Sequence, residues 1–251
     1  MSQAAADSRK TSYEHWMEQE GLPVLEAYGV EDVAHVSCQP WPRFGGRGAF
    51  IQLKGMEGIT GMYLAEIHGG GVLNSEKHIY EEVIYILKGR GLAEVWESGK
   101  EHRKQVFQWA AGSLFASPLN TWHRLLNDSQ DPVLLMAVTN APLVMDIFHN
   151  PDFIFQCDYQ FRDRYEGQEN YFETSGKKHR VGLQNIWETN LIPDVRSAVL
   201  EDLQHKGAGS QITQFEMAGN GLVGHIAEWP VGKVSQGPSP RSWGHRHHPE
   251  V

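Results

Sequence analysis

The stretch that decides the fold reads GGVLNSEKHIYEEVIYILKG (residues 70–89), and GSLFASPLNTWHRLLN (residues 112–127) follows it along the chain. Each stretch opens on glycine and contains a run of β-branched, aromatic and leucine side chains, which is typical of a short strand. His78 and Glu82 lie in the first stretch and His123 lies in the second. The residues most able to carry chemistry therefore lie in strand-like sequence.

Short apolar runs continue on both sides of these stretches, from Ala49 to about Asn150. Glycine, asparagine, aspartate, serine or proline separates the runs, which recur about every ten residues. This spacing predicts an antiparallel all-β sandwich or barrel instead of βαβ units. The predicted strands are AFIQL (49–53), GMYLAEI (61–67), VIYIL (83–87), GLAEVW (91–96), KQVFQW (104–109), SLFAS (113–117), HRLLN (123–127), VLLMAV (133–138) and LVMDIF (143–148).

Composition and charge exclude several classes of protein. The chain has 251 residues, of which 40% are hydrophobic and 21% are charged, with a net charge of −9. An acidic chain without a Lys/Arg cluster is not expected to bind nucleic acid or an anionic membrane surface. The two cysteines, Cys38 and Cys157, lie far apart and form no disulfide framework. No signal sequence and no apolar run of roughly 20 residues is present, so we expect a cytoplasmic protein.

The two stretches resemble the paired motifs of the cupin family. The second family motif contains a glycine, a proline, a further glycine, a histidine and an asparagine in that order. Here it matches at Gly112, Pro118, His123 and Asn127, and Asn120 stands where glycine is usual. Asparagine tolerates the left-handed backbone that glycine adopts in turns, so we expect this replacement to be mild.

The first family motif contains two histidines separated by one residue, then a glutamate, with a glycine at either end. This chain matches it at Gly70, His78, Glu82 and Gly89, and Glu76 replaces the first histidine. The resemblance covers residues 48–148 and implies a cupin fold, which is an all-β jelly-roll barrel also described as a double-stranded β-helix.

The resemblance also implies a metal site with the ligands Glu76, His78, Glu82 and His123. Two histidines with carboxylates suit Fe(II) or Mn(II), and Zn(II) or Ni(II) are alternatives. Because Glu76 adds negative charge where the family has a neutral imidazole, we expect a preference for harder metals. Two other interpretations stay open: Glu76 turns away and leaves three ligands, or Glu76 and Lys77 form a solvated charged pair.

Several functions follow from the resemblance. The first is a non-haem metal-dependent dioxygenase that acts on a small aromatic or organic acid. The alternatives are a metal-dependent decarboxylase, isomerase or lyase, and a non-catalytic ligand-binding cupin, because a fold alone does not decide function. A small-molecule substrate and a homo-oligomer are expected. No residue can be named as a general base.

The length of the chain, taken with the resemblance, predicts a two-cupin plan in which the second unit is incomplete. Thr11 or Ser12 begins a predicted helix that ends near Glu20. A second helix is predicted over residues 195–204. The break in pattern after about Val234 suggests the hypothesis of a shifted reading frame. The predicted parts are an N-terminal extension with a short helix (1–47), the cupin barrel (48–150), a partly helical connector (151–210), and the start of a second cupin unit with a disordered His-rich tail (211–251).

Overall fold

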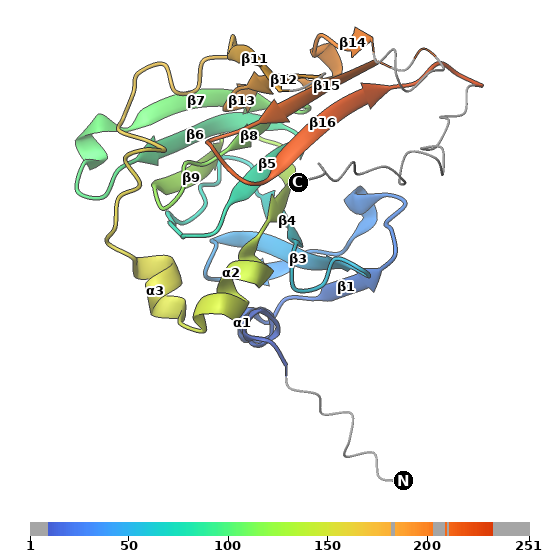
Figure 1. Cartoon of the computed structure of the whole chain (residues 1–251). Coiled ribbons are helices and arrows are strands. Elements are labelled where there is room, and N and C mark those ends of the chain that lie inside the picture. The colour runs from blue at the N-terminus through green and yellow to red at the C-terminus, as the bar shows by residue number, and fades with distance from the viewer. Residues whose placement is uncertain (1–9, 182–183, 203–208, 210, 233–251) are drawn as a thin grey trace, which may run out of the picture.

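Two β-sheets face each other across one core in the computed structural model, which describes residues 10–181, 184–202, 209 and 211–232 (Figure 1). The first sheet has the order β1-β3-β4-β10-β5-β8-β13, with β2 paired to β3, and the second has the order β7-β6-β9. The strands of the first sheet are β1 (Val24–Ala27), β2 (Gln39–Trp41), β3 (Gly46–Leu53), β4 (Gly61–Ile67), β5 (Glu82–Lys88), β8 (Leu114–Ala116), β10 (Val133–Thr139) and β13 (Leu191–Ile192). Those of the second are β6 (Arg90–Trp96), β7 (Gln105–Ala110) and β9 (Trp122–Asn127).

The alternation of side chains explains why these residues form a barrel. In β5, Glu82, Ile84 and Ile86 are buried while Val83 and Tyr85 between them are only partly so. Successive side chains of a strand point to opposite faces, so every second residue enters the core. The core combines residues of both sheets, such as Tyr63, Phe115 and Leu135 of the first with Ala93, Phe107 and Leu125 of the second. The all-β jelly-roll prediction is confirmed.

Eight predicted strands from AFIQL to VLLMAV are confirmed as β3 to β10, and the ninth is wrong. LVMDIF belongs to helix α2 (Ala141–Phe148). Pro142 lies in the first turn, where a missing amide hydrogen costs nothing. Ala141 and Met145 are buried four residues apart, whereas Ile147 is exposed. This helical spacing is the signal that the apolar composition concealed.

The helix predicted over residues 195–204 is also wrong. Over residues 195–202, the part of it that the structure describes, the helical content is a single 3-10 turn at Val195–Ser197. The Asp194 side chain accepts a hydrogen bond from the Arg196 amide and ion-pairs with its guanidinium, which satisfies the turn locally. The chain then extends into β14 (Glu201–Asp202), which pairs with a neighbouring strand instead of continuing a helix. The helix of the connector is instead α3 (Pro151–Gln156).

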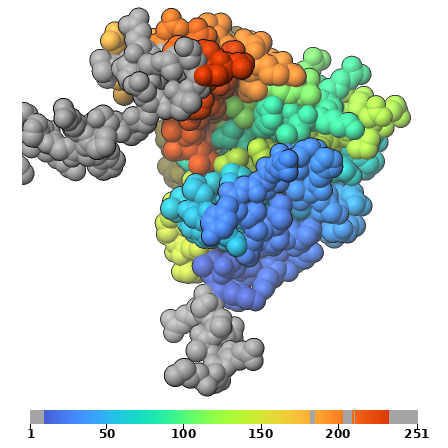
Figure 2. Space-filling model, turned by 90° about the vertical axis from the view of Figure 1, so that its right-hand side faces the viewer, coloured from blue at the N-terminus to red at the C-terminus, as the bar shows by residue number. Residues whose placement is uncertain are grey.

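The N-terminal segment, which is the described part of the predicted extension (residues 10–47), contributes strands to the barrel as well as its predicted helix. Helix α1 (Ser12–Glu20) forms as expected, because Thr11 caps it in a capping box with Glu14. However, β1 pairs with β3 in parallel and β2 pairs with β3 antiparallel, so both strands of the predicted extension join the first sheet. In the space-filling view the blue residues of this segment cover much of one face below the green barrel strands (Figure 2).

A further sheet lies beside the barrel, with orange and red strands at the top of Figure 1. It contains β11 (Lys177–Val181), β12 (Gln184–Glu188), β14, β15 (Gln211–Glu216) and β16 (Val223–Glu228). Residues 211–230, where the start of a second cupin unit was predicted, thus contain two strands, β15 and β16. The predicted His-rich tail and the reading-frame hypothesis lie outside the described residues, and the division into domains stays a prediction. Among the described residues, no helix has the length and apolar character needed to cross a membrane.

Candidate metal centre

The predicted ligands come together between the two facing sheets. Glu82 is the first residue of β5 in one sheet, and His123 lies on β9 in the other. Glu76 lies beside His123, because its amide donates to the His123 carbonyl at 3.0 Å and the His123 amide donates back at 2.9 Å. His78 follows two residues later and is 3% exposed. The structure therefore brings all four predicted residues to one place.

The ligand atoms converge. Glu82 Oε2 lies 3.8 Å from His78 Nε2 and 3.6 Å from His123 Nε2. Glu76 Oε1 lies 3.9 Å from His123 Nε2. Ligands bound at about 2.0–2.2 Å to one ion lie roughly 3 Å from their neighbours. The observed separations therefore leave space for one ion. A small inward movement of the side chains would bring their ligand atoms to these bonding distances.

Backbone carbonyls orient both imidazoles. His78 Nδ1 lies 2.8 Å from the Tyr80 carbonyl oxygen, and His123 Nδ1 lies 3.0 Å from that of Thr121. A carbonyl oxygen only accepts, so each Nδ1 carries the hydrogen and each Nε2 presents a lone pair to the centre. The Tyr80 ring stacks on His78 with 3.6 Å between centroids. Both rings are thus held in the tautomer and orientation that metal ligation needs.

Three buried atoms at the centre fit a metal ion. His78 Nε2, His123 Nε2 and Glu82 Oε2 have no hydrogen-bond partner among the described residues. Burying such atoms without a partner is costly, and native proteins normally satisfy them. A divalent ion would supply the missing partner to all three at once. The residues present therefore fit a bound metal.

The electrostatics of the centre favour positive charge. Burial alone would raise the pKa of Glu82, but the facing imidazoles outweigh burial and hold that pKa well below its usual range. Burial alone would lower the pKa of His123, but Glu82 and then Glu76 outweigh it and raise that pKa. Tyr63 donates its hydroxyl to Glu82 Oε1 at 2.7 Å, and burial raises the pKa of this hydroxyl well above normal. Glu82 is therefore held ionised with one oxygen free.

Glu76 has a partner that sequence reasoning missed. Its Oε2 accepts from Arg43 Nη1 at 2.6 Å, and its side chain is 11% exposed. Lys77 is buried and donates instead to the Cys157 carbonyl, so the structure contains no solvated Glu76–Lys77 pair. The sequence feature that could have pointed to Arg43 is its place in the aromatic and proline-rich stretch PWPRFGG (residues 40–46). However, no pattern within that stretch predicts Glu76 as the partner of Arg43.

Two other motif residues have structural roles. Asn120 adopts a φ of 55°, which confirms the left-handed backbone expected where the family has glycine. The buried Asn127 amide donates to the carbonyls of Ile67, His68 and Asp131 and so ties the end of β9 to the neighbouring turn. Both residues shape the loops around the ligands without facing them.

The space beside the ligands is small. A void of about 10 Å³ lies among Phe44, Tyr63, Glu76, Glu82 and His123, with other side chains around it. Such a void has room for about one water molecule. Side chains such as Phe44, Tyr63 and Leu125 therefore fill most of the space beside the ligands.

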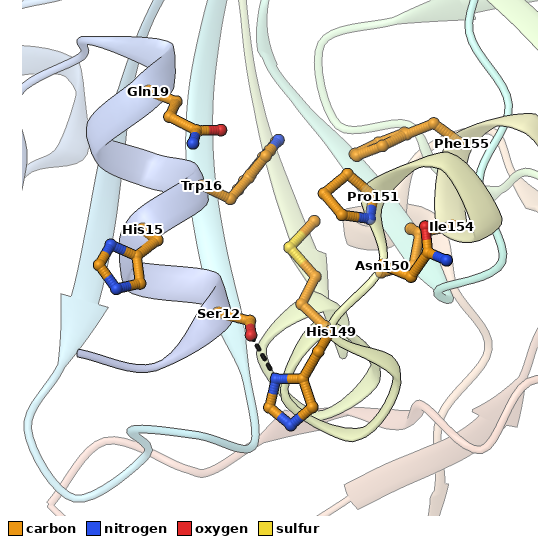
Figure 3. A pocket seen from close by; sticks show the side chains of 10 residues that line it. Ser12, His15, Trp16, Gln19, His149, Asn150, Pro151, Ile154 and Phe155 are labelled. Atoms are coloured by element: carbon orange, nitrogen blue, oxygen red, sulfur yellow. Dashed lines mark hydrogen bonds between the residues drawn. The ribbon is translucent and has the colours of Figure 1, made fainter. Parts of the chain in front are cut away.

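A larger cavity of about 180 Å³ lies between α1 and the two helices α2 and α3 (Figure 3). Trp16, Ile154 and Phe155 supply apolar surface to it. Ser12 and His149 lie at its edge and form a hydrogen bond. Trp16 and Phe155 also contact the Arg43 guanidinium, at 5.4 Å and 5.3 Å from the ring centroids. These two rings therefore stand between this cavity and the side chain that holds Glu76.

Comparison with known proteins identifies the domain. The family model described as "Cupin domain" matches residues 63–139, which hold the four candidate ligands. No curated protein matches the chain. Among solved structures, the chain is similar to the Lactobacillus farciminis oxalate decarboxylase formate complex, with 19% identity, 43% of this chain and 32% of that chain covered, and a TM-score of 0.37. It is also similar to the Schizosaccharomyces pombe Cnp3 cupin domain, with 14% identity, 43% and 71% covered, and a TM-score of 0.35.

The matched part of this chain spans about a third of the oxalate decarboxylase chain. The fold rests on the strands described above and on the family match, which agree on the same residues. Residues 63–139 of this protein match the cupin domain model, and the strands they form belong to a jelly-roll barrel.

Proposed function

We propose that this cupin binds one divalent metal ion through His78, Glu82 and His123, with Glu76 as a fourth ligand. The observation that carries the proposal is the convergence of three buried atoms without hydrogen-bond partners among the described residues. The carbonyl-bound Nδ1 atoms of both histidines and the Tyr63 bond to Glu82 support it, because outer contacts of this kind orient metal ligands.

Fe(II) or Mn(II) is the preferred ion in this proposal, ahead of Zn(II) or Ni(II). Two imidazoles and two carboxylates form a mixed nitrogen and oxygen set, which suits these metals better than soft thiophilic ions. The two cysteines do not contribute a thiolate, because neither belongs to the group of ligand atoms at the centre.

For the reaction, we propose a dioxygenase that acts on a small aromatic or organic acid. A bound ion would supply Lewis acidity and open coordination positions. The void of about 10 Å³ beside the ligands does not hold such a substrate, so Phe44 or a neighbouring side chain must move to admit one. The same filled void favours a second candidate, a metal-binding cupin without catalysis.

Metal content tests the proposal directly. The purified full chain is expected to carry about one metal ion, measured by elemental analysis. His78→Ala and His123→Ala each remove a ligand and are expected to lose most of that metal. His68→Ala is the matched control, because His68 is exposed and lies outside the ligand group. Unchanged metal content in both ligand variants would contradict the site.

Oxygen consumption separates the candidate reactions. Chain reconstituted with Fe(II) is expected to consume oxygen with at least one member of a panel of aromatic and organic acids. Substrate loss or CO₂ release without oxygen uptake would favour a decarboxylase, isomerase or lyase. Stable metal binding without turnover of any acid would favour the non-catalytic candidate.

A further inference from the structure

Glu76 divides its two carboxylate oxygens between two different partners. Oε2 accepts from Arg43 Nη1 at 2.6 Å, and Oε1 faces His123 Nε2 at 3.9 Å. The backbone of Glu76 is held by its two reciprocal hydrogen bonds with His123. With the backbone fixed and one oxygen held, only the direction of Oε1 remains to be set. The Arg43 contact sets it toward the candidate metal centre.

Arg43 is itself held in place. Its guanidinium lies 5.4 Å from the Trp16 ring centroid and 5.3 Å from that of Trp41. Its Nε lies 2.8 Å from Glu20 Oε1, at the end of α1. A planar guanidinium both stacks on aromatic rings and contacts two carboxylates with defined geometry, which a lysine does not reproduce. Arg43 is therefore a fixed charge and not a side chain that follows Glu76.

The charges around Arg43 keep it in this role. Burial would lower the pKa of Arg43, but the carboxylates of Glu76 and Glu20 outweigh burial and raise it. Arg43 thus offsets part of the negative charge that Glu76 and Glu82 concentrate at the centre. Glu20 in turn accepts a hydrogen bond from Trp41, so the carboxylate that pairs with Arg43 Nε is itself held in place.

The parts that hold Glu76 lie outside the matched cupin domain. Arg43 follows β2, and Glu20 and Trp16 belong to α1, all upstream of residue 63. The N-terminal segment therefore contacts the candidate metal centre through a continuous path of side chains from Glu20 to Arg43 to Glu76.

We infer that Arg43 is a positioning residue that makes Glu76 a metal ligand by holding its Oε2 and presenting its Oε1. The inference rests on the proposed function, because it concerns the same ion. It assigns to the N-terminal segment a direct part in completing the ligand set, at the position where glutamate replaces the family's histidine.

The test is the affinity of the full chain for Mn(II) or Co(II), measured by titration calorimetry. Arg43→Lys keeps the positive charge but loses the planar, stacked geometry, so a change reports position and not net charge. It is expected to weaken binding roughly 10- to 100-fold, as loss of an orienting contact does. Glu76→Gln is expected to weaken binding similarly, and the double variant no further, because both changes remove one interaction.

Co(II) absorption supplies a second readout, since its visible intensity reports the number and geometry of ligands. Arg43→Lys and Glu76→Gln are expected to give the same altered spectrum. Arg47→Lys is the matched control, because Arg47 pairs with Glu66 and the Cys38 carbonyl away from the centre. It is expected to keep the wild-type affinity and spectrum.

Several outcomes would overturn the inference. Arg43→Lys with unchanged affinity and spectrum would make Arg43 purely structural. Tighter binding would mean that Arg43 competes with the metal for Glu76. Additive losses in the double variant would mean that the two residues act separately. If Arg43→Lys fails to fold, Glu20→Gln serves instead. It weakens the ion pair between Glu20 and Arg43 and is expected to shift the Co(II) spectrum in the same direction. Absence of metal binding by the wild-type chain would instead refute the proposed function.

Discussion

Asn120 shows how a single residue replaces the glycine of a motif. Its φ of 55° lies in the left-handed region, which asparagine adopts more readily than other residues with a side chain. Its side-chain amide donates to the carbonyls of Cys157 and Tyr159 at 2.9 Å and 2.8 Å. A glycine could not make these bonds. The replacement therefore attaches the predicted connector to the loop between β8 and β9, which leads into the strand of His123.

Two substitutions at Asn120 separate these effects. Asn120→Ala loses both hydrogen bonds and strains the left-handed backbone, so we expect a loss of about 3 kcal/mol in the free energy of unfolding. Asn120→Gly loses the bonds but relieves the backbone, so its loss is expected to be smaller by about 1 kcal/mol. Urea denaturation of the two variants measures the difference. Equal losses would mean that the backbone conformation carries no cost.

At the scale of elements, the second sheet depends on a close contact between β6 and β9. A Cβ added to Gly91 on β6 would lie 1.9 Å from the Leu126 carbonyl oxygen and 2.5 Å from the Trp109 ring. Neither the backbone of β9 nor the buried ring has room to withdraw. Glycine at this position lets the strand that carries His123 pair closely with its neighbour.

Gly91→Ala is therefore expected to destabilise the protein by about 3 kcal/mol, at the upper end of the usual cost of overpacking. Thermal or urea unfolding measures the change. Gly29→Ala is the matched control, because a Cβ there meets no atom within 4 Å, and it is expected to leave stability nearly unchanged. A similar effect of both substitutions would contradict the steric explanation.

At the scale of the whole molecule, the candidate metal centre joins both barrel sheets. Its ligands come from β5, from β9 and from the segment of Glu76 and His78 between β4 and β5. An ion bound there would link these elements only in the folded state. Metal binding is therefore expected to stabilise the whole barrel and not one loop.

Thermal unfolding with and without metal tests this linkage. At a free Mn(II) concentration about 100 times the Kd, stabilisation of about 2.7 kcal/mol is expected, which corresponds to a rise in Tm of roughly 5–10 °C. A chelator should reverse the rise, and His123→Ala should abolish it. A Tm that neither metal nor chelator changes would contradict a metal site in the folded state.

The homo-oligomer and the cytoplasmic location stay predictions.

Much of the barrel was predictable, because strand formation follows local alternation. Runs such as GMYLAEI and VLLMAV contain buried residues at every second position, and all eight predicted runs form strands where expected. LVMDIF failed because a short apolar run suits a buried strand or a helix equally well. The N-terminus of α1 was also predictable, because its cap depends on residues close together in the sequence.

The sequence by itself determined the barrel strands, the helix at Ser12–Glu20 and the four residues that meet at the candidate centre. The strands and the helix depend on local periodicity and capping, and the four residues were predicted from the resemblance of two short motifs to the cupin family. All of these are short-range properties of the chain. Only the tertiary structure decided that Glu76 meets Arg43, that side chains leave little space beside the ligands, and that the N-terminal strands join the barrel. These are contacts between distant segments, and their partners are set by packing geometry that no local pattern encodes.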